Sequence, residues 1–243
     1  MSLSASILKP RTTLAGDPLA SFVTNLLHFN DVNGSTTFTD EAGPTWTRTG
    51  TSNRISTAVS KFGESSLASD GYNAEGARIQ SSNSIALAGQ DFCLEAFFYI
   101  ASAYDNSYAN RFIVGLKGAS SDYKCQILQY TNANPGGIFS SRYASVGSLG
   151  IGSVVTLPAK TRFYHLAHFR NGNTLYFTVD GVVQGTKDVT GVVVSGAQPL
   201  CVGANTDGNM FQAQGYIDEV RMTVGHSRYT GAFTPPTAAF PNP

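Results

Sequence analysis

The sequence is poor in charged residues. Asp, Glu, Lys and Arg make up 13% of its 243 residues, and 16 acidic side chains balance 16 basic ones. A typical globular protein has about 25% charged residues. Nucleic-acid-binding proteins usually carry a basic patch or stripe, and no cluster of Lys and Arg occurs in this chain. The sequence therefore predicts no nucleic-acid partner.

Long apolar runs are also missing. Every apolar run falls far short of the roughly 20 residues that a membrane-spanning helix needs. No polybasic or amphipathic helical stretch indicates binding to a membrane surface. Residues 1–10 lack the basic region and the long apolar core of a signal peptide. We expect a protein without a signal peptide or membrane insertion that folds in the cytoplasm.

Cysteine is scarce. Cys93, Cys125 and Cys201 are spread singly, and each lies in an apolar run. An odd number of isolated cysteines is not typical of a disulfide framework. Free cysteine is among the most buried residue types, so we expect three buried thiols in a reducing compartment.

The clearest pattern that the sequence does contain is strict alternation, with a period of two, from Phe92 to Ile100. One set of alternate residues is Phe92, Leu94, Ala96, Phe98 and Ile100, and the other is Cys93, Glu95, Phe97 and Tyr99. Alternation with aromatic enrichment predicts a β-strand. No segment shows a convincing period of 3.6 over ten residues. The sequence therefore predicts an all-β protein.

Turn signals separate the other strand-like runs. Asn171-Gly172 and Asp180-Gly181 lie between apolar runs, and such pairs are the strongest short hairpin signals. They predict a three-stranded meander. The further strands that we expect are 111–116, 123–131, 163–170, 174–179, 182–183, 200–203 and 216–224. Many short strands with regular turns are typical of a sandwich or a jelly roll.

The two ends of the chain differ from the middle. Residues 1–22 contain Pro10, Gly16 and Pro18 with little periodicity, which predicts an extended N-terminal arm. The domain then covers residues 23–243. The proline-rich tail from Phe233 to Pro243 cannot be a helix or a central strand, so we expect its two phenylalanines to clamp it onto the domain as a strap.

From residue 22 onward, several blocks resemble the laminin G-like, concanavalin A-like lectin and glucanase domains of bacteriophage virion proteins, in tail fibres or decoration proteins. These blocks are Leu27-His-Phe29, Phe38-Thr-Asp40, Lys61-Phe-Gly63, Asp91 to Phe98, Phe163 to Arg170, Val179-Asp-Gly181, Gly215 to Arg221 and Phe233-Thr-Pro-Pro236. The resemblance implies a jelly roll of two antiparallel sheets with one concave face. Ala96, Phe97 and His168 depart from the family pattern, so a ligand is not carried over from a relative.

The residues do not indicate catalysis. Glycoside hydrolases need two carboxylates, and no Glu-x-Asp-x-x-Glu pattern occurs. Asp218 and Glu219 are adjacent, so on a regular strand they point to opposite faces, as do His165 and His168. Glu95 is isolated. No Gly-x-Ser-x-Gly or phosphate-binding loop motif is present. We expect a protein that is not an enzyme, with a divergent glycoside hydrolase as the last alternative.

The resemblance also implies a calcium site, because domains of this kind often hold a calcium ion near the rim. The matching residues here are Asp31, Asp70 and Asp218. Calcium takes six to eight oxygen ligands, which carboxylates and backbone carbonyls supply. The alternative is that Asp218 caps a turn or pairs with an arginine.

A ligand site would need aromatic faces together with amides or acids. One loop combines these types, and further candidates are scattered along the chain. The candidate residues are Trp46, Tyr104, Asp105, Asn106, Tyr108, Tyr143, Asn205 and Asp207. Tyrosine serves protein interfaces as well as sugars, so both ligand classes stay open.

These observations and the resemblance lead to one functional expectation. We expect a non-catalytic structural or decoration protein on the surface of a bacteriophage virion, attached to other virion proteins through residues 1–22. The alternative is an adhesin that binds a cell-surface glycan. We also expect a homo-oligomer.

Overall fold

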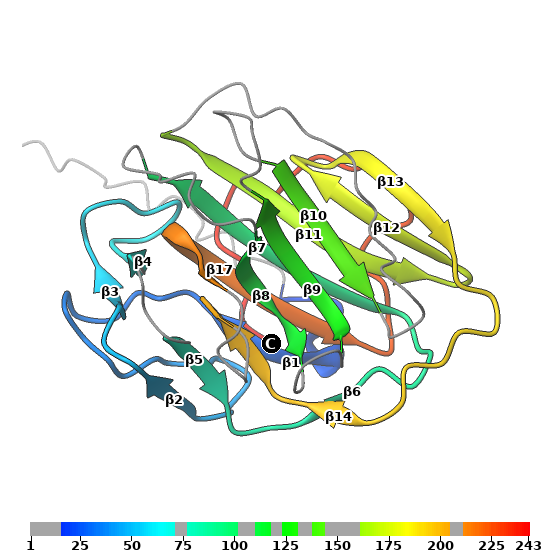
Figure 1. The fold of residues 1–243 in the computed structure, drawn as a ribbon, viewed down its shortest axis with the longest axis horizontal. Helices are drawn as coiled ribbons and strands as arrows, with labels where there is room; N and C mark the ends of the chain where they lie inside the picture. The colour runs from blue at the N-terminus through cyan, green and yellow to red at the C-terminus, as the bar shows by residue number, and fades with distance from the viewer. Residues whose placement is uncertain are drawn as a thin grey trace, which may run out of the picture.

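A computed structural model describes residues 16–70, 77–101, 110–117, 123–130, 138–143, 161–204 and 211–243. Most strands belong to two sheets that pack face to face (Figure 1). The eight-stranded sheet has the order β13-β12-β11-β7-β17-β4-β3, and β1 pairs with β17 beside β4. Its strands are β1 (Val23–Leu27), β3 (Asn53–Ser56), β4 (Ser66–Asp70), β7 (Phe92–Ile100), β11 (Phe163–Asn171), β12 (Thr174–Val179), β13 (Val182–Asp188) and β17 (Gln214–Val224).

The seven-stranded sheet has the order β10-β9-β8-β15-β5-β2, and β16 pairs with β8. Its strands are β2 (Trp46–Thr49), β5 (Arg78–Ser81), β8 (Asn110–Lys117), β9 (Tyr123–Tyr130), β10 (Ile138–Tyr143), β15 (Leu200–Val202) and β16 (Phe211–Gln212). A small third sheet pairs β6 (Ile85–Ala86) with β14 (Ala197–Gln198). All pairs are antiparallel except β16 with β8.

The prediction of an all-β antiparallel sandwich is confirmed. Within the described residues, the only helical element is a 3₁₀ turn at Ala20–Phe22, and no described helix is long and apolar enough to cross a membrane. The three-stranded meander is present as β11, β12 and β13.

The core between the sheets follows from the period of two along β7. Phe92, Leu94, Ala96, Phe98 and Ile100 are at most 1% exposed and belong to the main apolar core. Cys93 and Phe97 belong to two separate clusters on the opposite face. Because alternate residues of a strand point to opposite sides of the sheet, both faces of β7 are buried.

The second turn of the meander, at Asp180-Gly181, needs a glycine at its second position. Asp180 and Gly181 have φ angles of 49° and 73°, which are the left-handed values of a type I′ hairpin turn. A side chain at position 181 would collide with the backbone carbonyl of Phe233. Glycine therefore serves both the turn and the close approach of the C-terminal tail.

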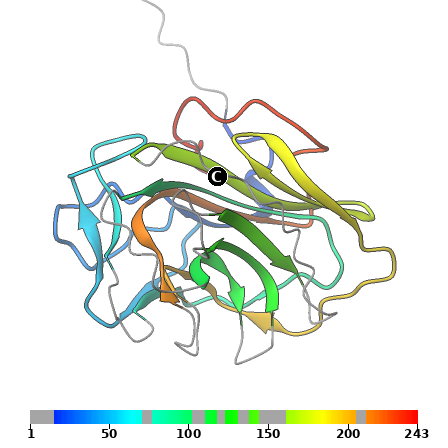
Figure 2. The same cartoon turned by 45° about the horizontal axis from the view of Figure 1, so that its top comes forward.

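The outer face of the eight-stranded sheet is covered by the last residues of the chain and by the segment from Gly16 to Phe22 rather than by a third layer. Residues 233–243, the C-terminal strap, cross this face (Figure 2). Phe233 stacks on Tyr229 with ring centroids 3.5 Å apart. Phe240 is 3% exposed and packs against Phe97 and the guanidinium of Arg221. The strap thus has the two phenylalanine anchors that the sequence predicts.

Beneath the strap lies a buried ionic cluster centred on Glu95. The guanidinium of Arg221 donates to Glu95 Oε1 at 2.8–2.9 Å. The Tyr229 hydroxyl donates to Oε2 at 2.8 Å, and His165 Nε2 lies 3.1 Å from the same oxygen. Burial alone would raise the pKa of Glu95, but Arg221 and the other partners hold it far below its usual value.

The N-terminal segment joins the same cluster through Asp17. Arg228 binds Asp17 with two hydrogen bonds of 2.6 and 3.0 Å, and Arg221 lies 3.6 Å from it. Asp17 is 7% exposed. Residues 16–22 of the predicted arm therefore lie against the sandwich.

We expect Glu95→Ala to lower the free energy of unfolding by about 3–5 kcal/mol, because removing one partner from a buried ion pair leaves the other charge without compensation. Chemical denaturation of the purified variant measures this. Glu64→Gln, at an exposed carboxylate, is the control and should leave the denaturation midpoint unchanged. Equal midpoints for the two variants would contradict the central role of Glu95.

Candidate functional site

The outer face of the seven-stranded sheet carries a row of residues, four of which have polar side chains: Thr47, Gln80, Gln126 and Arg142. Strand pairing places six residues side by side, one on each of six adjacent strands, and we name this set the polar row. Its members, in order across the sheet, are Thr47, Gln80, Cys201, Gly115, Gln126 and Arg142. Residues directly opposite each other in an antiparallel pair share a face, so the row lies on one side of the sheet.

Gln126 is the central polar group of this row. Its neighbours Cys125 and Ile127 point into the main core, so Gln126 points outward. The side chain is 0% exposed, and neither its amide nitrogen nor its amide oxygen has a hydrogen-bond partner. A buried polar group without a partner costs about 1–3 kcal/mol, and Gln126 is the residue with both of its amide atoms in this state among the described side chains.

Two features shape the surface around Gln126. Phe112, Leu128 and Cys201 form a small apolar cluster separate from the main core. Gly115 leaves no room for a side chain, because a Cβ there would lie 2.7 Å from Gln126 Cα. Gln80 and Arg142 flank the centre and are only half-buried. The polar row thus places the fully buried Gln126 amide between Gln80 and Arg142, which are half-buried, beside a small apolar cluster.

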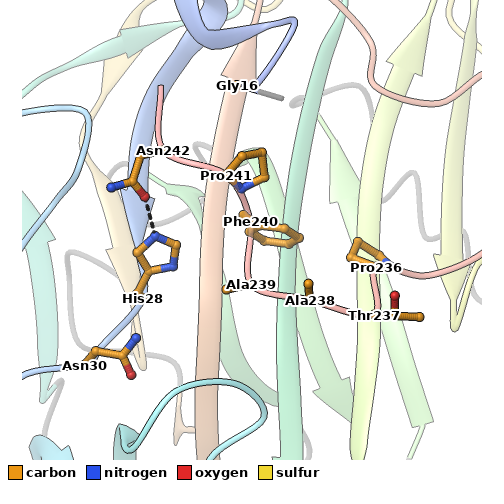
Figure 3. A pocket seen from close by; sticks show the side chains of 10 residues that line it. All are labelled: Gly16, His28, Asn30, Pro236, Thr237, Ala238, Ala239, Phe240, Pro241 and Asn242. Atoms are coloured by element: carbon orange, nitrogen blue, oxygen red, sulfur yellow. Dashed lines mark hydrogen bonds between the residues drawn. The ribbon is translucent and has the colours of Figure 1, made fainter. Parts of the chain in front are cut away.

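A second candidate site lies at the opposite face, along the C-terminal strap. A groove of about 690 Å³ runs between the strap and the end of β1 (Figure 3). We name it the strap groove, and its lining residues are Gly16, His28, Asn30 and Pro236 to Asn242. Pro236, Phe240 and Pro241 give it a largely apolar wall.

His28 stands at the polar end of the strap groove. Its Nδ1–H donates to Glu219 Oε1 and its Nε2–H to Asn242 Oδ1, both at 2.8 Å (Figure 3 draws the second). Burial disfavours the charged imidazole, but Glu219 outweighs it and the pKa of His28 rises to about 9. His28 therefore ties the strap to β17 as a cation at neutral pH.

A smaller pocket of about 180 Å³ shares His28 and Asn30 with the strap groove. It is also lined by Asp31, Thr39 and Glu41, and we name it the acidic pocket. Asp31 accepts hydrogen bonds from Thr39, and Glu41 accepts one from Asn242. The Thr39 and Asn242 side chains that donate these hydrogen bonds are neutral.

A β-bulge corrects the expectation for Asp218 and Glu219. The register of β17 against β7 shifts between Asp218 and Arg221, and Glu219 has a φ of 52°. The bulge inserts an extra residue, so both carboxylates point to the strap side instead of opposite faces. The Asp218 carboxylate accepts hydrogen bonds from the backbone N–H groups of Lys61 and Phe62. The Glu219 carboxylate accepts hydrogen bonds from His28 Nδ1–H and from the backbone N–H of Phe240.

The proposed calcium ligands do not form a common site among the described residues, which contain no group of three or more metal-ligating side chains. Both oxygens of Asp218 accept backbone N–H groups, at Lys61, Phe62 and Glu219. Burial, together with the Glu219 charge, raises the pKa of Asp218 to about 7, although the hydrogen bonds from these N–H groups act to lower it. Asp31 lines the acidic pocket, and Asp70 pairs with Gln214 through the backbone. The described residues do not test the calcium site, and calcium binding stays a prediction.

The other predicted ligand residues are dispersed. Trp46 packs against the main core and donates to Asp40 at 2.9 Å. Tyr143 is 0% exposed and stacks on Phe92, so its ring offers no face to solvent. The remaining candidates lie outside the described residues, namely Tyr104, Asp105, Asn106, Tyr108, Asn205 and Asp207. The structure therefore brings none of the described candidates together.

The two histidines of β11 point to opposite faces, as the strand predicts. His165 contacts Glu95 on the strap side, whereas His168 lies in the core with Nδ1 3.6 Å from the Cys125 sulfur. Burial lowers the pKa of His168 to about 3. The three cysteines are free and buried, in agreement with the sequence.

Sequence reasoning singled out neither Gln126 nor His28 as functional. Alternation along the predicted strand 123–131 could have placed Gln126 on the face opposite Ile127. It could not show that the amide is unpaired, because that depends on neighbours from other strands. His28 had no local signal, since its partners Glu219 and Asn242 are about 200 residues away.

The chain belongs to the concanavalin A-like lectin/glucanases superfamily, whose family model matches residues 73–224. The resemblance read from the sequence is confirmed at this level. No curated protein matches the chain significantly.

Solved structures with the same fold are distant in sequence. Domain 4 of AbnA, an extracellular arabinanase of Geobacillus stearothermophilus solved with arabinotriose, has a TM-score of 0.57 and 17% identity, with 87% of this chain and 94% of that chain covered. The Trypanosoma rangeli sialidase has a TM-score of 0.56 and 15% identity, over 84% of this chain and 31% of the sialidase.

The ligand-binding domain of botulinum neurotoxin serotype D, in complex with N-acetylneuraminic acid, has a TM-score of 0.56 and 11% identity. The comparison covers 84% of this chain and 48% of the neurotoxin chain. The present chain thus spans about a third of the sialidase and about half of the neurotoxin chain. At these identities the likeness shows the shared fold.

The His28 clamp predicts a pH dependence. A pKa raised from 6.5 to about 9 on folding means that its stabilisation is complete below pH 6.5 and is lost as the pH rises to about 9. We expect the Tm difference between wild type and His28→Gln to be largest at pH 6 and to shrink towards pH 9.5. Thermal scans of both proteins across this range measure it. A difference that stays constant with pH would contradict a charged His28.

Proposed function

We propose that this protein is a non-catalytic carbohydrate-recognition domain whose polar row binds glycan hydroxyls, and that it is displayed on a bacteriophage particle. The unpaired amide of Gln126 carries the proposal. A sugar hydroxyl both donates and accepts a hydrogen bond, so hydroxyl groups can satisfy the amide nitrogen and oxygen that the protein leaves without partners. Because Gln126 is 0% exposed, binding in this proposal requires that the amide becomes accessible to the ligand. Gln80 and Arg142 lie on the same row and extend the polar contacts on either side.

The fold supports this class of ligand. Among proteins with the same architecture, the arabinanase domain was solved with arabinotriose and the neurotoxin domain with N-acetylneuraminic acid. These ligands belong to those proteins and do not identify the sugar for this one. Polar side chains on a rigid strand scaffold keep fixed spacing, which favours recognition of a particular arrangement of hydroxyls.

The engagement of the buried carboxylates supports a non-catalytic role. Glu95, Asp218 and Glu219 are each 0% exposed and hydrogen-bonded within the protein. A glycosidase needs two carboxyl groups that face the scissile bond. These three carboxylates instead hold strands, the strap and the N-terminal segment together.

Display on a virion rests on the resemblance in sequence to phage virion domains and on the N-terminal segment. In this proposal residues before Gly16 contact other virion proteins, and several copies act together on the particle surface. Asp17 anchors the root of this segment to Arg228 in the sandwich. The domain would then be held at a fixed point while its opposite sheet faces outward.

The variant Gln126→Leu tests the glycan site, because glycan affinity should fall while thermal stability should not. Glycan-array screening identifies a ligand, and calorimetry then measures its Kd. We expect binding at least about tenfold weaker in the variant, because lost hydrogen bonds leave ligand hydroxyls unpaired. The Tm should stay equal or rise, since leucine removes an unpaired buried amide.

Lys187→Ala, on the edge strand of the other sheet, is the matched control and should bind like wild type. A Gln126→Leu variant with wild-type affinity, or a protein that binds no glycan, would sink the proposal.

Attachment is tested by deletion of residues 1–15, which keeps Asp17 and its ion pair with Arg228. We expect the shortened protein to keep the wild-type Tm and to be missing from purified particles. Deletion of residues 1–22 is the less specific experiment, because it also removes a buried charge from the cluster beneath the strap. Normal incorporation of the shortened protein would contradict attachment through this segment.

A further inference from the structure

The strap groove and the acidic pocket are built from residues that the family model does not match. The groove is lined by Gly16, His28, Asn30 and residues 236–242, and the pocket by residues between His28 and Glu41. The match covers residues 73–224. These two hollows therefore belong to the parts of the chain that lie outside the family domain.

Together the two hollows have the chemistry of a peptide-binding site. The groove offers a wall of proline, alanine and phenylalanine side chains, suited to apolar groups. The acidic pocket adds Asp31 and Glu41, whose hydrogen-bond partners are neutral. Glu219 is the main counter-charge of His28, and Glu41 also contributes. The pair of hollows thus fits an extended segment with apolar side chains next to a cation.

One segment of the same chain has this composition. Residues 1–15 contain no Asp or Glu, and they carry Ile7 and Leu8 directly before Lys9, Pro10 and Arg11. Pro10 favours an extended backbone. The apolar pair and the two cations thus lie next to each other in sequence, as the groove and the pocket do in space.

The segment also begins at the groove. Gly16 is one of the lining residues, and no atom lies within 4 Å of the place where its Cβ would be. Arg11 and Gly16 are five steps apart along the chain, which can span at most about 17 Å. The apolar pair and the cations are therefore within reach of the groove on their own molecule.

We propose that the strap groove and the acidic pocket bind residues 7–11 of the same chain, with Ile7 and Leu8 in the groove and Lys9 and Arg11 facing Asp31 and Glu41. A free peptide this short pays for lost translational and rotational freedom and would bind weakly. A short tether supplies an effective concentration in the millimolar range, so modest contacts suffice. This favours the chain's own segment over that of another copy.

The assignment goes beyond the proposed function. The same residues 1–15 are proposed to attach the domain to its particle, so docking would keep them on the free protein until a competing partner releases them. The glycan site on the other sheet is not part of this contact. A loss of glycan binding would therefore leave the docking of residues 7–11 untouched, and the reverse.

Site-specific photo-crosslinking in the full-length protein tests the docking. A photoreactive amino acid replaces Ile7, or Ser2 as the control, and mass spectrometry locates the crosslinks after irradiation. We expect crosslinks from position 7, within one chain, to residues 236–242 or 28–30, and at least fivefold fewer from position 2. Crosslinks from position 7 to other surfaces, crosslinks between copies, or none would overturn the proposal.

Charge reversal tests the acidic pocket in the same assay. Asp31→Lys with Glu41→Lys should lower the crosslink yield from position 7 at least fivefold at low salt, and Lys9→Glu with Arg11→Glu should restore it. Asp188→Lys, a charge reversal at an exposed site of β13, should leave the yield unchanged. Failure of the restoring pair, or an equal loss with Asp188→Lys, would refute the charge pairing.

Discussion

The buried carboxylate of Glu95 is the interaction on which the outer face of the eight-stranded sheet depends. It neutralises Arg221 and binds Tyr229 and His165, while Arg228 and Arg221 in turn hold Asp17. One charge cluster therefore connects the central strands, the start of the described chain and the base of the strap. Without compensation, two guanidinium groups would be buried on the same face.

The bulge at Glu219 extends this organisation to the groove. A regular strand would turn Glu219 towards the main core, where a carboxylate has no partner. The extra residue, held at a φ of 52°, points it to His28 and to the Phe240 amide instead. The strained backbone at Glu219 therefore serves the structure, because it directs the carboxylate to the residues that hold the strap and line the groove.

The two sheets divide the work of the domain. The eight-stranded sheet uses its outer polar groups for internal ion pairs, and the segment that starts at Gly16 and the C-terminal strap lie on it (Figure 2). The seven-stranded sheet keeps a polar row in which the Gln126 amide has no protein partner. The charged groups of the first face are paired within the protein, which suits attachment, whereas an unpaired amide suits recognition of a ligand, as the proposed function assigns them.

The sequence alone determined the elements that depend on local rules. Alternation located β7 at its observed bounds, and Asp180-Gly181 located a hairpin turn, because side-chain direction and turn geometry are set within a few residues. Only the tertiary structure decided the sites. Whether Gln126 is unpaired, whether Glu95 is isolated and where Glu219 points all depend on partners far away in sequence, and a register shift of one residue reverses the direction of a side chain.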